Sequence, residues 1–125
     1  MPQDLIRRAL MKIDKNYLPY EYFEQLQELK EYEIVEGITF IRLPTHKDLY
    51  FKILLEEGSN VNDHYHNSME YFFIEKGRVI LNDLKELTRG DKFTLEAFEQ
   101  HNIKILEYTE MYVQFVKDES FKDFK

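Results

Sequence analysis

The stretch from Gly58 to Gly77 constrains the fold of this chain more than any other, because it places two histidines and a glutamate at strand spacing. His64 and His66 are two residues apart, so both side chains leave the same face of an extended backbone. Glu70 lies four residues further on and keeps that parity. A turn after His66 would fold the strand of Glu70 back beside the histidine strand. The spacing therefore predicts a cluster of two histidines and one glutamate.

A cluster of this kind is a typical site for a transition metal. Imidazole nitrogens and a carboxylate oxygen suit ions of Mn, Fe, Co, Ni, Cu or Zn. The chain has no cysteine, which excludes thiolate ligands, thiol nucleophiles and disulfides. Any metal must be held by nitrogen and oxygen atoms. We therefore predict one divalent transition metal ion, whose identity the sequence leaves open.

The same residues resemble the first motif of the cupin superfamily. In that motif a glycine is followed at fixed intervals by two histidines, a glutamate and a second glycine. All five positions are filled here, by Gly58, His64, His66, Glu70 and Gly77. Five specified residues at fixed spacing arise by chance on the order of once in several million starting points, so coincidence is a poor explanation.

The second cupin motif is matched only in part. It begins at Gly90 and supplies His101 where the family places its third histidine. Where the family commonly has proline, any residue and glycine, this chain has Glu96, Ala97 and Phe98. The resemblance implies that His101 joins His64, His66 and Glu70 as a metal ligand.

The pattern around His101 supports this role independently. His101, Ile103 and Ile105 share one parity, while Asn102 and Lys104 share the other. His101 therefore points with the apolar residues, and a buried imidazole needs a partner. The alternative is a core histidine hydrogen-bonded to a backbone carbonyl. The fourth histidine, His46, fits no ligand spacing and is interpreted as a surface residue.

Length and charge limit the class of protein. A chain of 125 residues fits one domain around one core. Its net charge of -7 argues against binding to a phosphate backbone, so we expect no nucleic-acid partner. No apolar run approaches a membrane span or the core of a signal peptide, so we expect no membrane partner and a cytoplasmic location.

The chain divides into an arm, a barrel and a tail. Apolar residues at helical spacing predict helices over residues 3–13 and 19–32, within an N-terminal helical arm of residues 1–33. Residues 34–117 change to strand and turn patterns, with a turn expected at Gly77, and residues 118–125 form a charged tail. About eight short strands indicate an all-β antiparallel sandwich or barrel. The resemblance implies a double-stranded β-helix, the cupin or jelly-roll barrel.

The strand after Ser68 has two apolar faces. Glu70, Phe72 and Ile74 should point inward, yet Met69, Tyr71 and Phe73 on the other face are also large and apolar. Either the helical arm or a second subunit is expected to cover them. We favour a homodimer. The resemblance supports this expectation, because many cupins of this size are dimers.

Two functions from different classes remain open. The first is a metal-dependent cupin that binds a small organic molecule in the barrel, where the resemblance implies dioxygenase, isomerase, decarboxylase or lyase activity. The second is a non-catalytic barrel that senses or stores a small ligand. Fold alone does not choose between them, and no catalytic residue beyond the metal ligands is identified.

Overall fold

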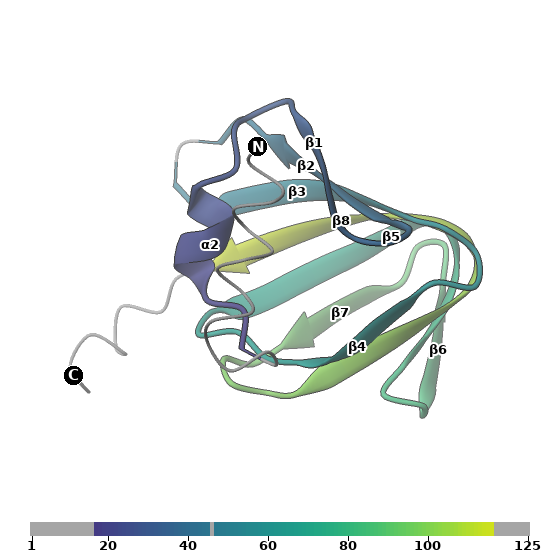
Figure 1. The fold of residues 1–125 in the computed structure, drawn as a ribbon. Coiled ribbons are helices and arrows are strands. Elements are labelled where there is room, and N and C mark those ends of the chain that lie inside the picture. The colour runs from purple at the N-terminus through teal and green to yellow at the C-terminus, as the bar shows by residue number, and fades with distance from the viewer. Residues whose placement is uncertain (1–16, 46, 117–125) are drawn as a thin grey trace.

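One short helix and eight antiparallel strands build the part of the chain that the computed structural model describes, residues 17–45 and 47–116. Figure 1 shows them as a barrel with the helix at one end. This confirms the all-β jelly-roll class. The elements are α2 (Tyr20–Glu24), β1 (Glu31–Val35), β2 (Ile38–Leu43), β3 (Leu49–Leu55), β4 (Asn60–His64), β5 (Met69–Leu81), β6 (Lys85–Thr88), β7 (Lys92–Leu95) and β8 (His101–Val116).

The two long strands, β5 and β8, form the spine of the barrel. They pair antiparallel along most of their length, from Met69 opposite Val116 to Leu81 opposite Ile103. The first half of β5 also pairs with β7 and its second half with β6. The first part of β8 pairs with β4, and its last part with β3. Because each long strand changes its second partner midway, the sheet closes around a core.

The change of partner coincides with a bulge at Gly77. The sequence pattern placed a turn here, which is wrong, since β5 continues through Gly77 with shifts of register on both sides. The glycine has a φ of +101°, a conformation that side chains with a Cβ rarely adopt. Thr109 lies opposite, and its hydroxyl accepts a hydrogen bond from the backbone N–H of Arg78 at 3.1 Å. The strand that carries Thr109, β8, runs without a break from His101 to Val116.

Alternation of apolar and polar residues fills the barrel. Along β3 and the C-terminal half of β8, every second residue is buried. Aromatic rings occupy the end of the core under α2: Phe23 from the helix stacks on Phe115 with ring centroids 4.7 Å apart and also contacts Phe51. Figure 1 shows α2 crossing this end of the barrel.

The helical arm is shorter than the sequence predicted. Of the helix expected over residues 19–32, only Tyr20–Glu24 is helical, and β1 begins at Glu31, inside the expected arm. Tyr32 and Ile34 are buried and alternate with exposed neighbours, because this segment pairs with β2. Strand pairing thus overrides a weak helical pattern. The helix expected over residues 3–13, the tail of residues 118–125 and His46 lie outside the described residues.

The outward face of β5 is open in the described chain. Glu70, Phe72 and Ile74 are buried as expected, while Tyr71 and Phe73 are 41% and 37% exposed. The described part of the arm therefore leaves these two rings partly in solvent. Cover by a second subunit remains a prediction.

No helix of the described residues is both long and apolar enough to cross a bilayer. The cytoplasmic location expected from the sequence remains a prediction, as does the absence of a nucleic-acid partner.

The bulge gives a stability prediction. A Cβ at Gly77 would lie 2.6 Å from Cα of Thr109 and closer still to the Tyr108 carbonyl oxygen, so backbone must move. We expect Gly77→Ala to lower the free energy of unfolding by more than about 3 kcal/mol in urea titrations. Gly90→Ala is the control, because its φ is +91° but nothing lies within 4 Å of the added Cβ. It should cost about 1–2 kcal/mol, and equal losses in the two variants would show that the bulge is not a tight contact.

The open face of β5 gives a prediction about association. Tyr71→Lys places a charge among the outward rings and should convert a dimer to a monomer in light scattering, with the fold unchanged. Leu84→Lys is the control, because Leu84 is also an exposed apolar residue but lies in the turn between β5 and β6. Wild-type protein that is monomeric at high micromolar concentration would reject the dimer.

Candidate metal centre

Three strand ends bring the histidines and the glutamate together. His64 is the last residue of β4 and pairs directly with His101, the first residue of β8. His66 follows two residues after His64, and Glu70 is the second residue of β5. The His64 and His101 ring centroids are 4.0 Å apart, and the His66 ring lies 4.8 Å from the first and 5.2 Å from the second. All four side chains are buried, so the structure gathers the four residues that the sequence proposed.

The two histidines of the first motif and Glu70 do not meet through the simple turn expected after His66. Strand β5 does not pair with β4, because β8 pairs with both. Glu70 instead lies between Phe115 of β8 and Leu95 of β7. Glu70 therefore reaches the histidines from between β7 and β8, and not through a hairpin with β4.

Backbone carbonyl groups orient all three imidazole rings. The Nδ1 atoms of His64, His66 and His101 lie 2.8, 2.8 and 3.1 Å from the carbonyl oxygens of Asn62, Leu18 and Glu99. A carbonyl only accepts, so each Nδ1 carries the proton and donates it. In the neutral ring the lone pair is then on Nε2, which is the arrangement of a metal-binding histidine.

The Nε2 atoms converge with the carboxylate of Glu70. The three histidines offer ligand atoms that all lie within 4.8 Å of one another. One oxygen of Glu70 is 3.5 Å from Nε2 of His66, and the other is 3.5 Å from Nε2 of His101. Among the described residues, Nε2 of His66 and Oε1 of Glu70 are buried without a hydrogen-bond partner. Unsatisfied buried polar atoms are costly, and a shared cation would satisfy both. The three buried histidines can hold a metal ion, and the two oxygens of Glu70 lie beside His66 and His101.

Burial keeps the empty site uncharged at neutral pH. It lowers the pKa of His101 to about 3, and it lowers the pKa of His66 well below the ordinary value, aided by the neighbouring His64 and His101. The pKa of His64 is also lowered, chiefly by burial. Burial raises the pKa of Glu70 to about 8. Three neutral imidazoles are ready to bind a cation, whereas Glu70 must first give up a proton.

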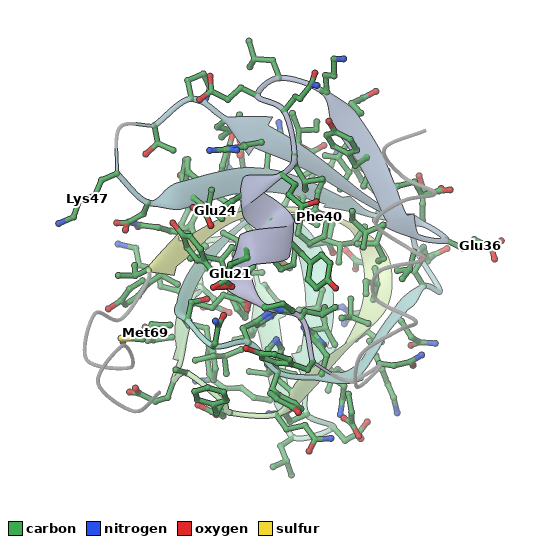
Figure 2. The ribbon with its side chains drawn as sticks, turned by 60° about the vertical axis from the view of Figure 1, so that its left-hand side comes forward. Glu21, Glu24, Glu36, Phe40, Lys47 and Met69 are labelled. Atoms are coloured by element: carbon green, nitrogen blue, oxygen red, sulfur yellow. The ribbon has the colours of Figure 1, made fainter. Side chains whose placement is uncertain are left out.

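The segment before β1 completes the site, and no pattern in the sequence indicates this role. The carbonyl oxygen of Leu18 accepts the hydrogen bond from His66, and the N–H of Leu18 donates to the Tyr65 carbonyl oxygen at 2.9 Å. The side-chain oxygen of Asn67 accepts from the N–H of Tyr20 at 2.7 Å, at the start of α2. Figure 2 shows this helix, with Glu21 and Glu24, in front of the barrel and Phe40 beside it. A main-chain carbonyl has no sequence signature, so spacing alone does not identify Leu18.

The degenerate turn before His101 keeps its backbone shape without glycine. Phe98 has a φ of +65° and its N–H donates to the carbonyl oxygen of His66 at 2.7 Å. The ring of Phe98 is half exposed and stacks against Tyr17 and Tyr65, with centroids 6.4 Å away in each case. Phe98 stands where the family commonly has glycine, so here a residue with a Cβ adopts a strained positive φ. His101 still lies opposite His64.

A cavity of about 70 Å³ adjoins the four residues. Its wall includes Phe23 of α2 and Phe40 of β2, so the helix limits the cavity at one end. Apart from the histidines and Glu70, every lining side chain within residues 17–45 and 47–116 is apolar: Leu18, Phe23, Ile34, Val35, Ile38, Phe40, Ile53, Leu55, Val61, Phe72, Ile103, Met111, Val113 and Phe115.

Comparison with known proteins shows the fold. No protein-family model matches the chain, and no curated protein matches it. Among solved structures, it is similar to an RmlC-like cupin from Shewanella frigidimarina, with 22% identity, a TM-score of 0.64 and coverage of 82% of this chain and 91% of that one. It is similar to KdgF from Halomonas sp., with 16% identity, a TM-score of 0.60 and coverage of 74% and 90%.

A third similar structure is a larger chain, from Rhodobacter sphaeroides SigE in complex with the anti-sigma ChrR. The identity is 16%, the TM-score is 0.64, and the match covers 73% of this chain and 51% of that chain. This protein thus spans about half of that relative's length. Together with the antiparallel jelly roll, these similarities show that the chain is a small protein of the cupin fold.

Proposed function

We propose that the protein is a metal-dependent cupin that binds a small organic molecule beside one divalent transition metal ion. The ion is held by Nε2 of three histidines and by one carboxylate oxygen, from His64, His66, His101 and Glu70. The observation that carries the proposal is a set of buried atoms that face one another without hydrogen bonds. Nε2 of His66 lies 3.5 Å from one oxygen of Glu70, and the other oxygen, Oε1, lies 3.5 Å from Nε2 of His101. When bound, the ion supplies Lewis acidity or oxygen activation at the coordination positions that the protein leaves open.

The residues of the chain have separate tasks in this proposal. The histidines donate lone pairs from rings that backbone carbonyls hold in one orientation. Glu70 supplies the one negative charge that offsets part of the ion's charge. The apolar wall keeps water away from the bound molecule, which strengthens electrostatic interactions inside the cavity.

The described part of the lining contains no separate proton acceptor. Its titratable side chains are the four proposed ligands alone, because the remaining lining residues are apolar. A ligand such as Glu70 is a poor general base while it holds a cation. Isomerase and lyase reactions, which transfer a proton, therefore fit less well than oxygenation of a bound molecule. We place a dioxygenase first among the enzymes that the fold supports.

The same observation favours a non-catalytic alternative, in which the barrel senses or stores a small ligand. A turnover screen under air and under nitrogen separates the two. Oxygen uptake that depends on the bound metal supports the enzyme. Tight binding without turnover supports the sensor.

The metal site is tested by removing one ligand. His66→Ala should abolish stoichiometric metal and weaken affinity by at least about 100-fold, because the remaining residues cannot close the site. The barrel should stay folded, since its strands pair without the ion. Elemental analysis of protein without a histidine tag gives the measurement. His46→Ala is the control, because it removes the histidine that matches no ligand spacing. Equal metal content in both variants would contradict the site, as would wild-type protein that binds no transition metal at micromolar concentration.

The raised pKa of Glu70 predicts how metal-free protein responds to pH. Above pH 7 the histidines are neutral in both states, while Glu70 is ionised when unfolded and protonated when folded until its pKa of about 8. Stability should therefore fall by about 1 kcal/mol between pH 7 and pH 9 in urea titrations. Glu70→Gln cannot ionise and should lack this fall. A parallel pH dependence in the two proteins would show that Glu70 is already charged in the empty site.

A further inference from the structure

The lining of the cavity restricts the chemical class of the ligand. Of its 18 residues, four are the proposed metal ligands and 14 are apolar. Among the described residues, no lysine, arginine, serine, threonine, asparagine or glutamine lines it. The wall therefore offers a bound molecule apolar contact and no hydrogen bond from a side chain outside the metal centre.

The charge of the site adds a second restriction. A divalent cation held by three uncharged imidazole rings and one carboxylate carries a formal charge of +1 (two minus one). The four residues are buried, and an uncompensated buried charge is costly. No charged side chain other than Glu70 lies in the lining to offset it. A ligand that brings one negative charge makes the site neutral.

The volume of the cavity adds a third restriction on the ligand. At about 70 Å³ the cavity is smaller than the roughly 150 Å³ of an engineered apolar cavity that accepts benzene. Phe23 limits the size of the cavity, because its ring is held between Phe115 and His66. The ring centroid of Phe23 lies 4.7 Å from that of Phe115 and 5.8 Å from that of His66. The hydrocarbon part of a ligand should therefore be smaller than a benzene ring.

Resting on the proposed function, we propose that the ligand is a small monoanion with one oxygen-donor group and a hydrocarbon body. The oxygen donor, such as a carboxylate or an enolate, faces the histidines and Glu70. The hydrocarbon body lies against side chains such as Ile53, Val61 and Val113. Sugars, amino acids, phosphates and dicarboxylates are rejected, because each further polar group would be buried without a partner.

Four probes of matched size and different polarity test the proposal on Co²⁺-bound wild-type protein. Butyrate has the proposed chemistry. Butyramide lacks the charge, β-alanine replaces the terminal methyl with an ammonium group, and 3-hydroxypropionate replaces it with a hydroxyl group. Calorimetry gives the affinities, and the visible absorption of Co²⁺ reports coordination. We expect butyrate to bind at least about tenfold more tightly than each of the other three, and hexanoate to bind more weakly than butyrate because of its length.

A variant of the wall tests whether the apolar lining sets this preference. Val61→Thr keeps the shape of a half-buried side chain and adds a hydroxyl group to the cavity. The ratio of the butyrate and 3-hydroxypropionate affinities should fall by about fivefold or more. Val116→Thr is the matched control, because Val116 is also a half-buried strand residue but does not line the cavity. It should leave the ratio unchanged.

The outcomes separate this inference from the function on which it rests. Wild-type protein that takes up no Co²⁺ or other transition metal rejects both. Metal-bound protein that binds β-alanine, butyramide or 3-hydroxypropionate as tightly as butyrate rejects the ligand class and leaves the metal site intact. An unchanged affinity ratio in Val61→Thr likewise overturns the inference, since the wall would then not determine selectivity.

Discussion

The pairing of β5 with β8 is the interaction on which the rest of the structure depends. It joins Glu70, near the start of β5, to a strand whose first residue is His101. The same strand β8 pairs with β4 and sets His64 opposite His101. The bulge at Gly77 lets both long strands bend, so that each serves two sets of neighbours. The metal centre therefore takes its geometry from long-range strand pairing more than from the loop between the motif residues.

The clustering of His64, His66, Glu70 and His101 could be predicted because side-chain parity is a local property of strands. His64, His66 and Glu70 share a face by spacing alone, and the alternation after His101 places it with the core. The inward and outward faces of β5 follow the same rule and are observed. Pairing partners are not local, so the neighbours of Glu70 were not predictable from the turn after His66. The strand at Glu31–Val35 shows the same limit, since its pairing with β2 replaces the helix that the spacing predicted.

Two features depend on backbone conformation, which residue type indicates only weakly. A glycine between two strand patterns predicts a turn at Gly77. A β-bulge, however, needs the same positive φ that a turn needs, so the residue type does not separate the two. Phe98 shows the converse, because the turn before His101 keeps a positive φ without glycine. The carbonyl oxygen of His66, which accepts a hydrogen bond from Phe98, helps to hold this turn. A positive φ at a residue other than glycine indicates that neighbouring contacts determine the conformation.

The polarity of the site explains why its chemistry must come from whatever it binds. Burial leaves the histidines neutral and Glu70 protonated, so the empty centre holds no charge. A cation that displaces the proton of Glu70 creates a site with one excess positive charge inside an apolar wall. The protein then contributes orientation, through carbonyl groups such as that of Leu18, and exclusion of water, through rings such as Phe23. In the function that we propose, reactivity and selectivity are divided: the metal centre would set the charge of the ligand, and the wall would set the size and polarity of the rest of it.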